Sequence, residues 1–311
     1  MSGVLFAQLN ALFGGTMMAI GREAAGIHLE NPVPAAWFAA IMYLIIAPIN
    51  TVWWLLIHFG KMKPLHNSAS AQGKHPLELK GIVWMAVHSL ASAAGIVGLW
   101  EGLARSTAAT GSLLSRIEVV VAIILGLWLL REKFTKWHWL GFVLTIVGMV
   151  VVRWAELSGD TAAFVYLLGG AIGFGIAEFS GKIAVQYWPV ARLTAIRAWL
   201  MLAALFIYAM ISTGGLPSID KAHWPWIVAA ALLGPFISRN CYMLALSYLP
   251  VSQVVLLNQA QPLYSGLVGF ILLAEVPKPL FYLGALAIIL GNITLILAKG
   301  QHPSKSSANP A

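Results

Sequence analysis

Two charged residues lie two positions apart inside a long apolar stretch of the sequence, residues 111–133. They are Arg116 and Glu118, and the stretch around them is long enough to cross a lipid bilayer. A charged side chain at the centre of a membrane helix costs roughly 2.5 to 3.5 kcal/mol, so it faces protein, water or a ligand rather than lipid. The planar guanidinium of arginine suits a carboxylate, because it donates two parallel hydrogen bonds. The pair therefore predicts a site for a small charged molecule.

The spacing of the pair predicts how its charges are used. Positions two apart on a continuous α-helix differ in direction by about 200°, given 3.6 residues per turn. Arg116 and Glu118 would then lie on opposite faces and could not form one salt bridge. We therefore expect each of them to have a partner on another helix.

Other polar residues fall inside apolar stretches as well. Sixteen of the nineteen basic residues are assigned to loops or to the ends of predicted helices. The remaining three, Arg116, Arg197 and Arg239, are assigned to helix interiors, where glutamates are also found. One interpretation is that the glutamates only neutralise the arginines and fix helix packing; the other is substrate binding, with proton coupling as a further role. The predicted substrate-binding residues are Arg116, Glu118, Asn258, Gln259, Gln261, Tyr264, Arg197, Arg239 and Asn10, and the candidates for proton coupling are Glu118, His88 and Glu178. His88 is also explained by packing, as a hydrogen-bonded residue in an apolar helix.

Composition identifies the elements that must position these residues. The chain of 311 residues is 59% hydrophobic and 10% charged, with a mean hydropathy of +0.82, whereas about a quarter of the residues in soluble domains are charged. Continuous apolar runs of about 20 residues predict membrane helices, since membrane strands would show alternation. The predicted fold is an all-α integral membrane protein with ten spans, at residues 4–21, 35–57, 81–103, 112–131, 137–154, 161–181, 190–212, 224–246, 251–273 and 280–298.

The connections between these spans predict orientation and exclude some partners. The first span lacks a preceding basic region and is expected to be retained rather than cleaved. Most loop lysines and arginines fall on the side of both termini, which predicts that both lie in the cytoplasm. The net charge of +8 is spread over loops rather than gathered on one face, so nucleic acid is not expected as a partner. The single cysteine, Cys241, excludes an intrachain disulfide.

An internal repeat divides the chain into two halves. An offset of 143 aligns Glu132 with Glu275, Gly141 with Gly284 and Gly148 with Gly291, and it places Gln259 and Gln261 opposite Arg116 and Glu118. An offset of 160 aligns Gly15 with Gly175. Five spans in each half are an odd number, so the second half would enter the membrane from the opposite side. We predict a first repeat at residues 1–157, a second at residues 158–299, and a disordered tail at residues 300–311.

Glycines and prolines within the predicted spans indicate helix packing and bending. Gly141 and Gly148, like Gly284 and Gly291, are seven apart and allow close helix approach, and Gly169 with Gly173 forms a GxxxG pair. Pro48, Pro235 and Pro262 are predicted to kink their helices, because each removes a backbone hydrogen bond.

Two matching segments carry a family resemblance. The stretches LLREKFTKWHWLGFVLTIVGMVVV and LLAEVPKPLFYLGALAIILGNITLI resemble the EamA-type branch of the drug/metabolite transporter superfamily, over essentially the whole chain. The resemblance implies a ten-helix inverted-repeat transporter of small metabolites, commonly an exporter of a bacterial inner membrane. Pro262 fits the proline that precedes the glutamate in this family, whereas Val119 replaces it in the first half. Pro189 with Arg197 also resembles the family, and Ala40 is the first-half counterpart of Arg197.

These observations together predict a secondary transporter that exports a small metabolite by alternating access. The expected substrate is an amino acid or a related small organic anion, in a bacterial inner membrane. Its partners are this substrate and the lipid bilayer, and a homodimer is an alternative to a monomer. The competing predictions are an intramembrane enzyme or a channel acting on a small polar or lipid-linked substrate. The sequence contains no HExxH, GxSxG or phosphate-loop motif, so we expect no enzyme activity, cofactor or metal.

Overall fold

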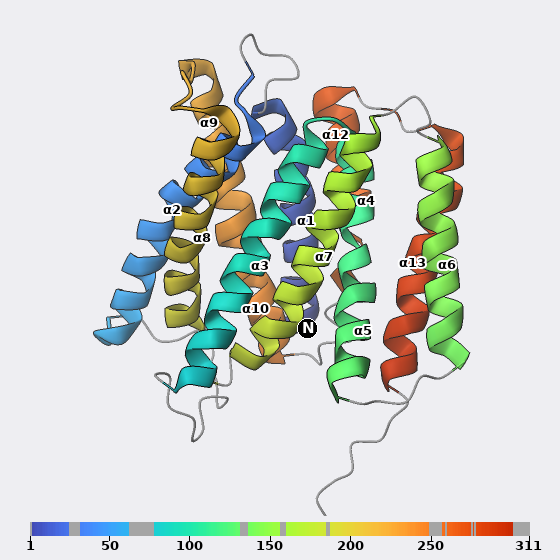
Figure 1. Ribbon diagram of the computed structural model, residues 1–311, viewed down its shortest axis with the longest axis horizontal. Coiled ribbons are helices and arrows are strands. Elements are labelled where there is room, and N and C mark those ends of the chain that lie inside the picture. The colour runs from blue at the N-terminus through green and yellow to red at the C-terminus, as the bar shows by residue number, and fades with distance from the viewer. Residues whose placement is uncertain are drawn as a thin grey trace, which may run out of the picture.

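The computed structural model describes residues 2–24, 32–61, 78–130, 136–155, 160–184, 187–248, 257–258, 260–274, 276 and 278–300. These residues form a bundle of upright helices and contain no strand (Figure 1). The helices are α1 (Ser2–Ala24), α2 (Ala35–His58), α3 (Leu79–Leu103), α4 (Ala108–Ser115), α5 (Ile117–Leu130), α6 (Lys136–Ala155), α7 (Thr161–Ala184), α8 (Val190–Thr213), the 3-10 turn η2 (Lys221–His223), α9 (Trp224–Ala231), the π-helix η3 (Leu232–Ser238), α10 (Arg239–Tyr248), α12 (Gln261–Leu273) and α13 (Pro279–Gly300).

Five of the described helices are long and apolar enough to cross a membrane. They are Gly3–Ala24, Ala35–His58, Leu79–Leu103, Thr161–Gly181 and Val190–Thr213. Shorter apolar helices follow at Trp139–Val151, Gln261–Leu273 and Pro279–Thr294. The start of α1 and the end of α13 lie at the same end of the bundle (Figure 1).

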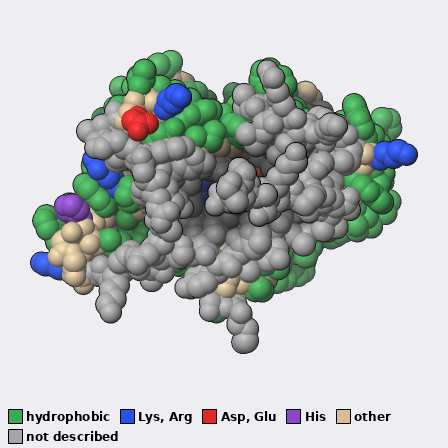
Figure 2. Space-filling model, turned by 90° about the horizontal axis from the view of Figure 1, so that it is seen from below, with side chains coloured by type: hydrophobic (Ala, Val, Ile, Leu, Met, Phe, Trp, Pro, Cys, Tyr) green, Lys and Arg blue, Asp and Glu red, His purple; other side chains and the backbone are tan. Residues whose placement is uncertain are grey.

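The distribution of side chains is the reverse of that in a soluble protein. Leu5, Trp128 and Ile211 are more than half exposed, whereas Arg116 and Arg197 are buried. Seen from one end of the bundle, most of the described surface is hydrophobic, and the charged side chains lie mainly at its margin (Figure 2). This arrangement suits a bundle whose sides face lipid and whose polar groups face inward.

The predicted segment at residues 112–131 is not one continuous helix. It is divided between α4 and α5 at Arg116, whose N–H bonds the carbonyl oxygen of Leu113 at 3.0 Å. The amide of Val119 donates to the carbonyl oxygen of Arg116 at 3.1 Å, and the Nδ2 of Asn292 donates to the same oxygen at 3.2 Å. These bonds satisfy backbone groups that a helix end leaves open.

Two of the three prolines lie in backbone geometry that differs from the predicted kink within a regular helix. Pro48 lies inside α2 as expected. Pro235 lies within η3, where the turn is widened to a π-helix, an irregularity frequent at functional sites. Pro262 was predicted to kink a helix, but it lies in the first turn of α12, where its missing N–H has no helical acceptor to lose.

Glycines set the closest helix contacts. A Cβ at Gly148 of α6 would lie 2.7 Å from the carbonyl oxygen of Gly284 in α13, and one at Gly291 would lie 2.8 Å from that of Gly141. The close approach predicted for these four glycines is therefore confirmed. In the α3–α7 contact the prediction was half wrong, because Gly173 packs on Gly95 whereas a Cβ at Gly169 would meet no atom within 4 Å.

The difference between Gly169 and Gly173 gives a direct stability test. A Cβ at Gly173 would lie 2.7 Å from the amide nitrogen of Gly95, so Gly173→Ala should push α3 and α7 apart and destabilise the protein by about 1 to 3 kcal/mol. Gly169→Ala is the control on the same helix. It should leave stability unchanged or raise it by up to about 1 kcal/mol, since alanine is the better helix former. Thermal unfolding in detergent measures both, and equal effects would contradict the assigned contact.

Candidate functional site

Arg116 and Glu118 form an ion pair. The Nη1 of Arg116 lies 3.2 Å from the Oε1 of Glu118, so the expectation of two separate contacts was wrong. The 200° difference between their directions holds only for a continuous helix, and the helix breaks at Arg116. Arg116 is 4% exposed, and its Nε has no hydrogen-bond partner among the described residues. The guanidinium therefore retains a donor for a further group.

A second ion pair links α7 and α10. Glu178 on α7 accepts a hydrogen bond from Nη1 of Arg239 on α10 at 2.9 Å and another from the hydroxyl of Tyr242 at 3.0 Å. The guanidinium of Arg239 also lies 5.3 Å from the centre of the Tyr242 ring, within range of a cation–π interaction. Both carboxylate oxygens of Glu178 are thus occupied, which favours a structural role for this pair.

Arg197 on α8 has polar partners but no ion pair with another described residue. Its Nε lies 3.2 Å from the hydroxyl oxygen of Ser92 on α3, and it also hydrogen-bonds Tyr43 on α2. No carboxylate of the described residues lies within 4.0 Å of its charged nitrogens. Arg197 is 9% exposed and therefore buried. A buried guanidinium that two hydroxyl groups hold in place can bind an anionic group by donating hydrogen bonds to it.

These charges belong to one cluster inside the bundle. Glu118 lies close enough to Glu178 and Arg239 for their charges to interact, and Arg197 lies close to the same two residues. With Arg116 included, the described part of the cluster contains three arginines and two glutamates, which leaves one positive charge in excess. The side chains of Glu118 and Glu178 are 16% and 30% exposed, so water can reach the carboxylates.

His88 on α3 borders the cluster. Its Nδ1 lies 2.8 Å from the carbonyl oxygen of Ala177, which assigns the ring proton to Nδ1. The Nε2 is buried and has no partner among the described residues. The charges of Arg197 and Arg239 are near enough to interact with the ring. His88 can therefore accept a hydrogen bond from a ligand or a water molecule.

Amide side chains form an adjoining network that joins α1 to η3 and to Asn258 of the second half. The Nδ2 of Asn10 donates to the Oδ1 of Asn258 at 2.7 Å, and the hydroxyl of Ser238 donates to the Oδ1 of Asn10 at 2.8 Å. Ser238 immediately precedes Arg239 in the sequence, so the chain places the amide network next to the charged cluster.

Two further predicted residues lie beside this network. The hydroxyl of Tyr264 on α12 donates to the Oε1 of Gln8 at 3.2 Å. Gln261 is buried, and its Nε2 lies 3.8 Å from the sulfur of Met18, a weak acceptor. Gln259, Glu132 and Glu275 lie outside the described residues.

The structure adds partners that the sequence analysis did not single out. Tyr43 and Ser92 hold Arg197, Tyr242 holds Glu178, and Ser238 holds Asn10. Tyrosines and serines are common in apolar helices, so their positions carried no distinguishing signal. No group of three metal-ligand side chains comes together in the described part of the chain.

The sequence profile of the EamA-like transporter family matches residues 1–154 and again residues 161–297. The chain belongs to the EamA-like transporter family. It is 22% identical to protein LicB of Haemophilus influenzae over 73% of this chain and 80% of that protein. It is 24% identical to an uncharacterized transporter of Synechocystis over 71% of this chain and 67% of that protein.

The fold of this EamA-like protein also occurs in a solved crystal structure. That structure superposes with a TM-score of 0.65 at 16% sequence identity, covering 98% of this chain and 99% of the other. Membership of the EamA-like transporter family makes the chain an integral membrane protein of a transporter family, as the sequence resemblance predicted. The central charges of this EamA-like protein therefore lie among membrane helices, where an ionisable group is a functional candidate by default.

Proposed function

We propose that the protein is a secondary transporter that exports an amino acid or a related small organic anion by alternating access. The observation that carries this proposal is Arg197, a buried guanidinium held by hydroxyl groups beside a cluster with one excess positive charge. A carboxylate bound there would neutralise that charge and receive two parallel hydrogen bonds. The proposed location is a bacterial inner membrane, with both termini in the cytoplasm.

The roles of the other polar residues follow from their partners. Arg116, whose Nε has no partner among the described residues, joins Arg197 in binding the carboxylate. Glu118 and the amides of Asn258, Gln259 and Gln261 hold an amine or hydroxyl of the substrate, and Asn10 positions Asn258. Tyr264 supports α1 through Gln8. Arg239 and Glu178 hold the site together as an ion pair.

We also propose ten membrane spans arranged as two inverted five-helix repeats, residues 1–157 and 158–299. The α6–α13 contact supports this arrangement. Gly148 meets Gly284 and Ile288, while Gly291 meets Gly141 and Thr145. The offset of 143 relates Gly148 to Gly291, and it also relates their partners, Gly141 to Gly284 and Thr145 to Ile288. Each contact is therefore the counterpart of the other, as a twofold relation between the halves requires.

The same relation extends to the site. A Cβ at Gly15 of α1 would lie 2.8 Å from the carbonyl oxygen of Gln261, and one at Gly175 of α7 would lie 2.8 Å from that of Glu118. The offset of 160 relates the two glycines, and the offset of 143 relates Glu118 to Gln261. The two matches to the family profile, at residues 1–154 and 161–297, add independent support.

The helix breaks fall at related places as well. The first half breaks at Arg116, and in the second half α12 begins at Gln261 after a turn in which Ala260 N–H donates to the carbonyl oxygen of Leu257 at 3.3 Å. Discontinuous helices commonly form the substrate site of inverted-repeat transporters. A rocking motion of one half against the other would expose this site alternately to the two sides.

Proton coupling is a secondary part of the proposal. Glu118 and Glu178 are partly accessible, and the Nε2 of His88 has no described partner. These groups could exchange a proton with water while the arginines hold the substrate. Transport that does not respond to an imposed pH gradient would exclude this coupling.

Counterflow in proteoliposomes tests the function. We expect vesicles preloaded with a pool of amino acids or organic acids to accumulate labelled members of that pool, while sugars and nucleosides give no signal. Arg116→Ala should abolish the accumulation, because it removes a buried donor from the carboxylate site. Correct folding of the variant is checked by its unfolding temperature in detergent.

The remaining outcomes separate the alternatives. A linear, unsaturable flux would indicate a channel, whereas product formation without sealed vesicles would indicate an enzyme. If a pool of neutral compounds shows counterflow and Arg116→Ala leaves that counterflow unchanged, the assigned site is wrong. Arg116 would then have a structural role.

A further inference from the structure

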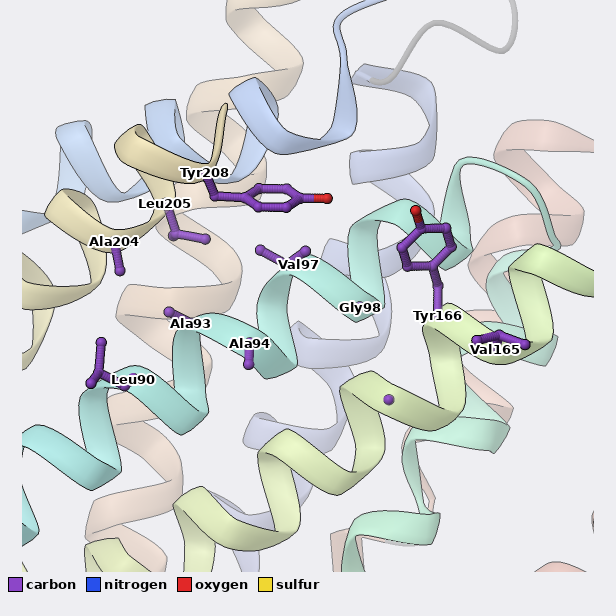
Figure 3. A pocket seen from close by; sticks show the side chains of 11 residues that line it. Leu90, Ala93, Ala94, Val97, Gly98, Val165, Tyr166, Ala204, Leu205 and Tyr208 are labelled. Carbon is purple, nitrogen blue, oxygen red and sulfur yellow. The ribbon is translucent and has the colours of Figure 1, made fainter. Parts of the chain in front are cut away.

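An apolar groove runs along the outside of α3 between α7 and α8, and none of its lining residues belongs to the charged cluster. Its volume is about 480 Å³. Ala93, Ala94 and Val97 of α3 form its floor, with α7 on one side and α8 on the other (Figure 3). The small side chains of the floor leave room for the groove along the helix axis. From Leu90 to Gly98 it follows α3 for about 12 Å, at 1.5 Å per residue.

The groove faces outward from three helices that can span a membrane. Leu90 and Val165, which border it, are 59% and 62% exposed. In an integral membrane protein the medium beside such residues is hydrocarbon. A long apolar groove on this surface therefore fits an acyl chain, which is flexible and as apolar as the lining.

One end of the groove is polar. The hydroxyl groups of Tyr166 and Tyr208 lie at the end opposite Leu90 (Figure 3). The guanidinium of Arg105 lies 5.1 Å from the centre of the Tyr166 ring, and Tyr208 is close enough to Glu101 and Arg105 to interact electrostatically. Aromatic side chains with an apolar body and a polar tip are typical of the membrane–water interface.

The charges at this end are mixed. Nη1 of Arg105 lies 2.7 Å from the Oε2 of Glu101, and its Nε lies 3.7 Å from the Oδ2 of Asp160. The hydrogen bond to Glu101 raises the pKa of Arg105, so its guanidinium stays charged. The side chains of Arg105 and Asp160 are 36% and 50% exposed, and can therefore meet a headgroup. Two carboxylates and one guanidinium suit a ligand with both an ammonium and a phosphate.

We propose that this groove binds one phospholipid with a primary ammonium in its headgroup. One acyl chain lies along α3, the phosphate faces Arg105, and the ammonium faces Glu101 and Asp160. The site is separate from the proposed substrate site and does not depend on the transported molecule.

Gly169 allows the groove to be filled without disturbing the fold. It lines the groove, and a Cβ there would meet no atom within 4 Å, whereas the α3–α7 contact uses Gly170 and Gly173. Gly169→Leu should therefore occupy the space of the acyl chain. Ala203→Leu, at an exposed position of α8 outside the groove lining, is the matched control.

Photolabelling in vesicles tests the proposal. The probe is phosphatidylethanolamine with a diazirine in its acyl chain, added to phosphatidylcholine vesicles that contain the full chain. Labelled peptides should concentrate at residues 90–98 and 165–169. Gly169→Leu should reduce this labelling about tenfold, as the loss of about two buried methylenes would, whereas Ala203→Leu should not. Even labelling of all exposed helices, or equal labelling of the two variants, would overturn the proposal.

Competition tests the headgroup separately. Unlabelled phosphatidylethanolamine should displace the probe better than phosphatidylcholine, whose methylated ammonium cannot donate hydrogen bonds, and better than phosphatidylglycerol, which lacks the ammonium. The double change Glu101→Gln with Asp160→Asn should remove this preference and leave acyl-chain labelling in place. Equal competition by all three lipids in the natural chain would contradict the headgroup assignment.

Discussion

Replacing Glu178 with glutamine is expected to destabilise the folded protein by about 2 to 3 kcal/mol, because it leaves the guanidinium of Arg239 without its counter-ion. Breaking a fully buried pair costs about 3 to 5 kcal/mol. The expected value is lower here because the two side chains are 21% and 30% exposed and water can replace part of the interaction. Thermal unfolding in detergent, with chemical denaturation to obtain free energies, measures the loss.

A double variant separates the pair interaction from the cost of an unpaired charge. Glu178→Gln combined with Arg239→Gln leaves no charge unpaired, so it should be more stable than Glu178→Gln alone. Glu101→Gln serves as the control, since it breaks the Glu101–Arg105 pair near the end of α3 and should cost less than about 1 kcal/mol. If Glu178→Gln costs no more than Glu101→Gln, the central pair is not structural.

The sequence predicted the parts of the fold that depend on local composition. Apolar runs located helices such as α2, α3 and α8 to within about two residues of each end. Repeated spacing located the glycines of the α6–α13 contact, because small residues allow two backbones to approach closely. The pair Glu101–Arg105 was likewise predictable, since residues four apart meet on any helix.

The sequence failed where the backbone leaves regular geometry or where rotation of a helix decides the outcome. The break at Arg116 turns two side chains expected on opposite faces into an ion pair. Gly169 and Gly170 are neighbours, yet only Gly170 faces α3, since the GxxxG spacing alone does not fix which face is used. Likewise, the partners of Arg197 come from α2 and α3, far away in the sequence.

Arg197→Gln is expected to weaken substrate binding by roughly 30-fold or more, while the protein remains folded. Losing one partner of a buried charge pair costs about 2 to 5 kcal/mol, which corresponds to at least this factor. The fold should survive because no described carboxylate pairs with Arg197, so its removal leaves no unpaired acid, and glutamine can still bond Ser92 or Tyr43. The concentration dependence of counterflow measures the change.

A carboxamide analogue of the transported acid shows whether Arg197 binds the carboxylate itself. The natural chain should strongly prefer the acid over its amide, because the excess positive charge has no counterpart on the amide. Arg197→Gln should lose most of this preference, and Arg197→Lys should keep part of it, since lysine restores the charge but not the planar fork. Arg105→Gln, which changes an arginine paired outside the cluster, should leave the preference intact. If Arg197→Gln lowers transport equally for acid and amide, the arginine acts on the conformation of the carrier rather than on the substrate.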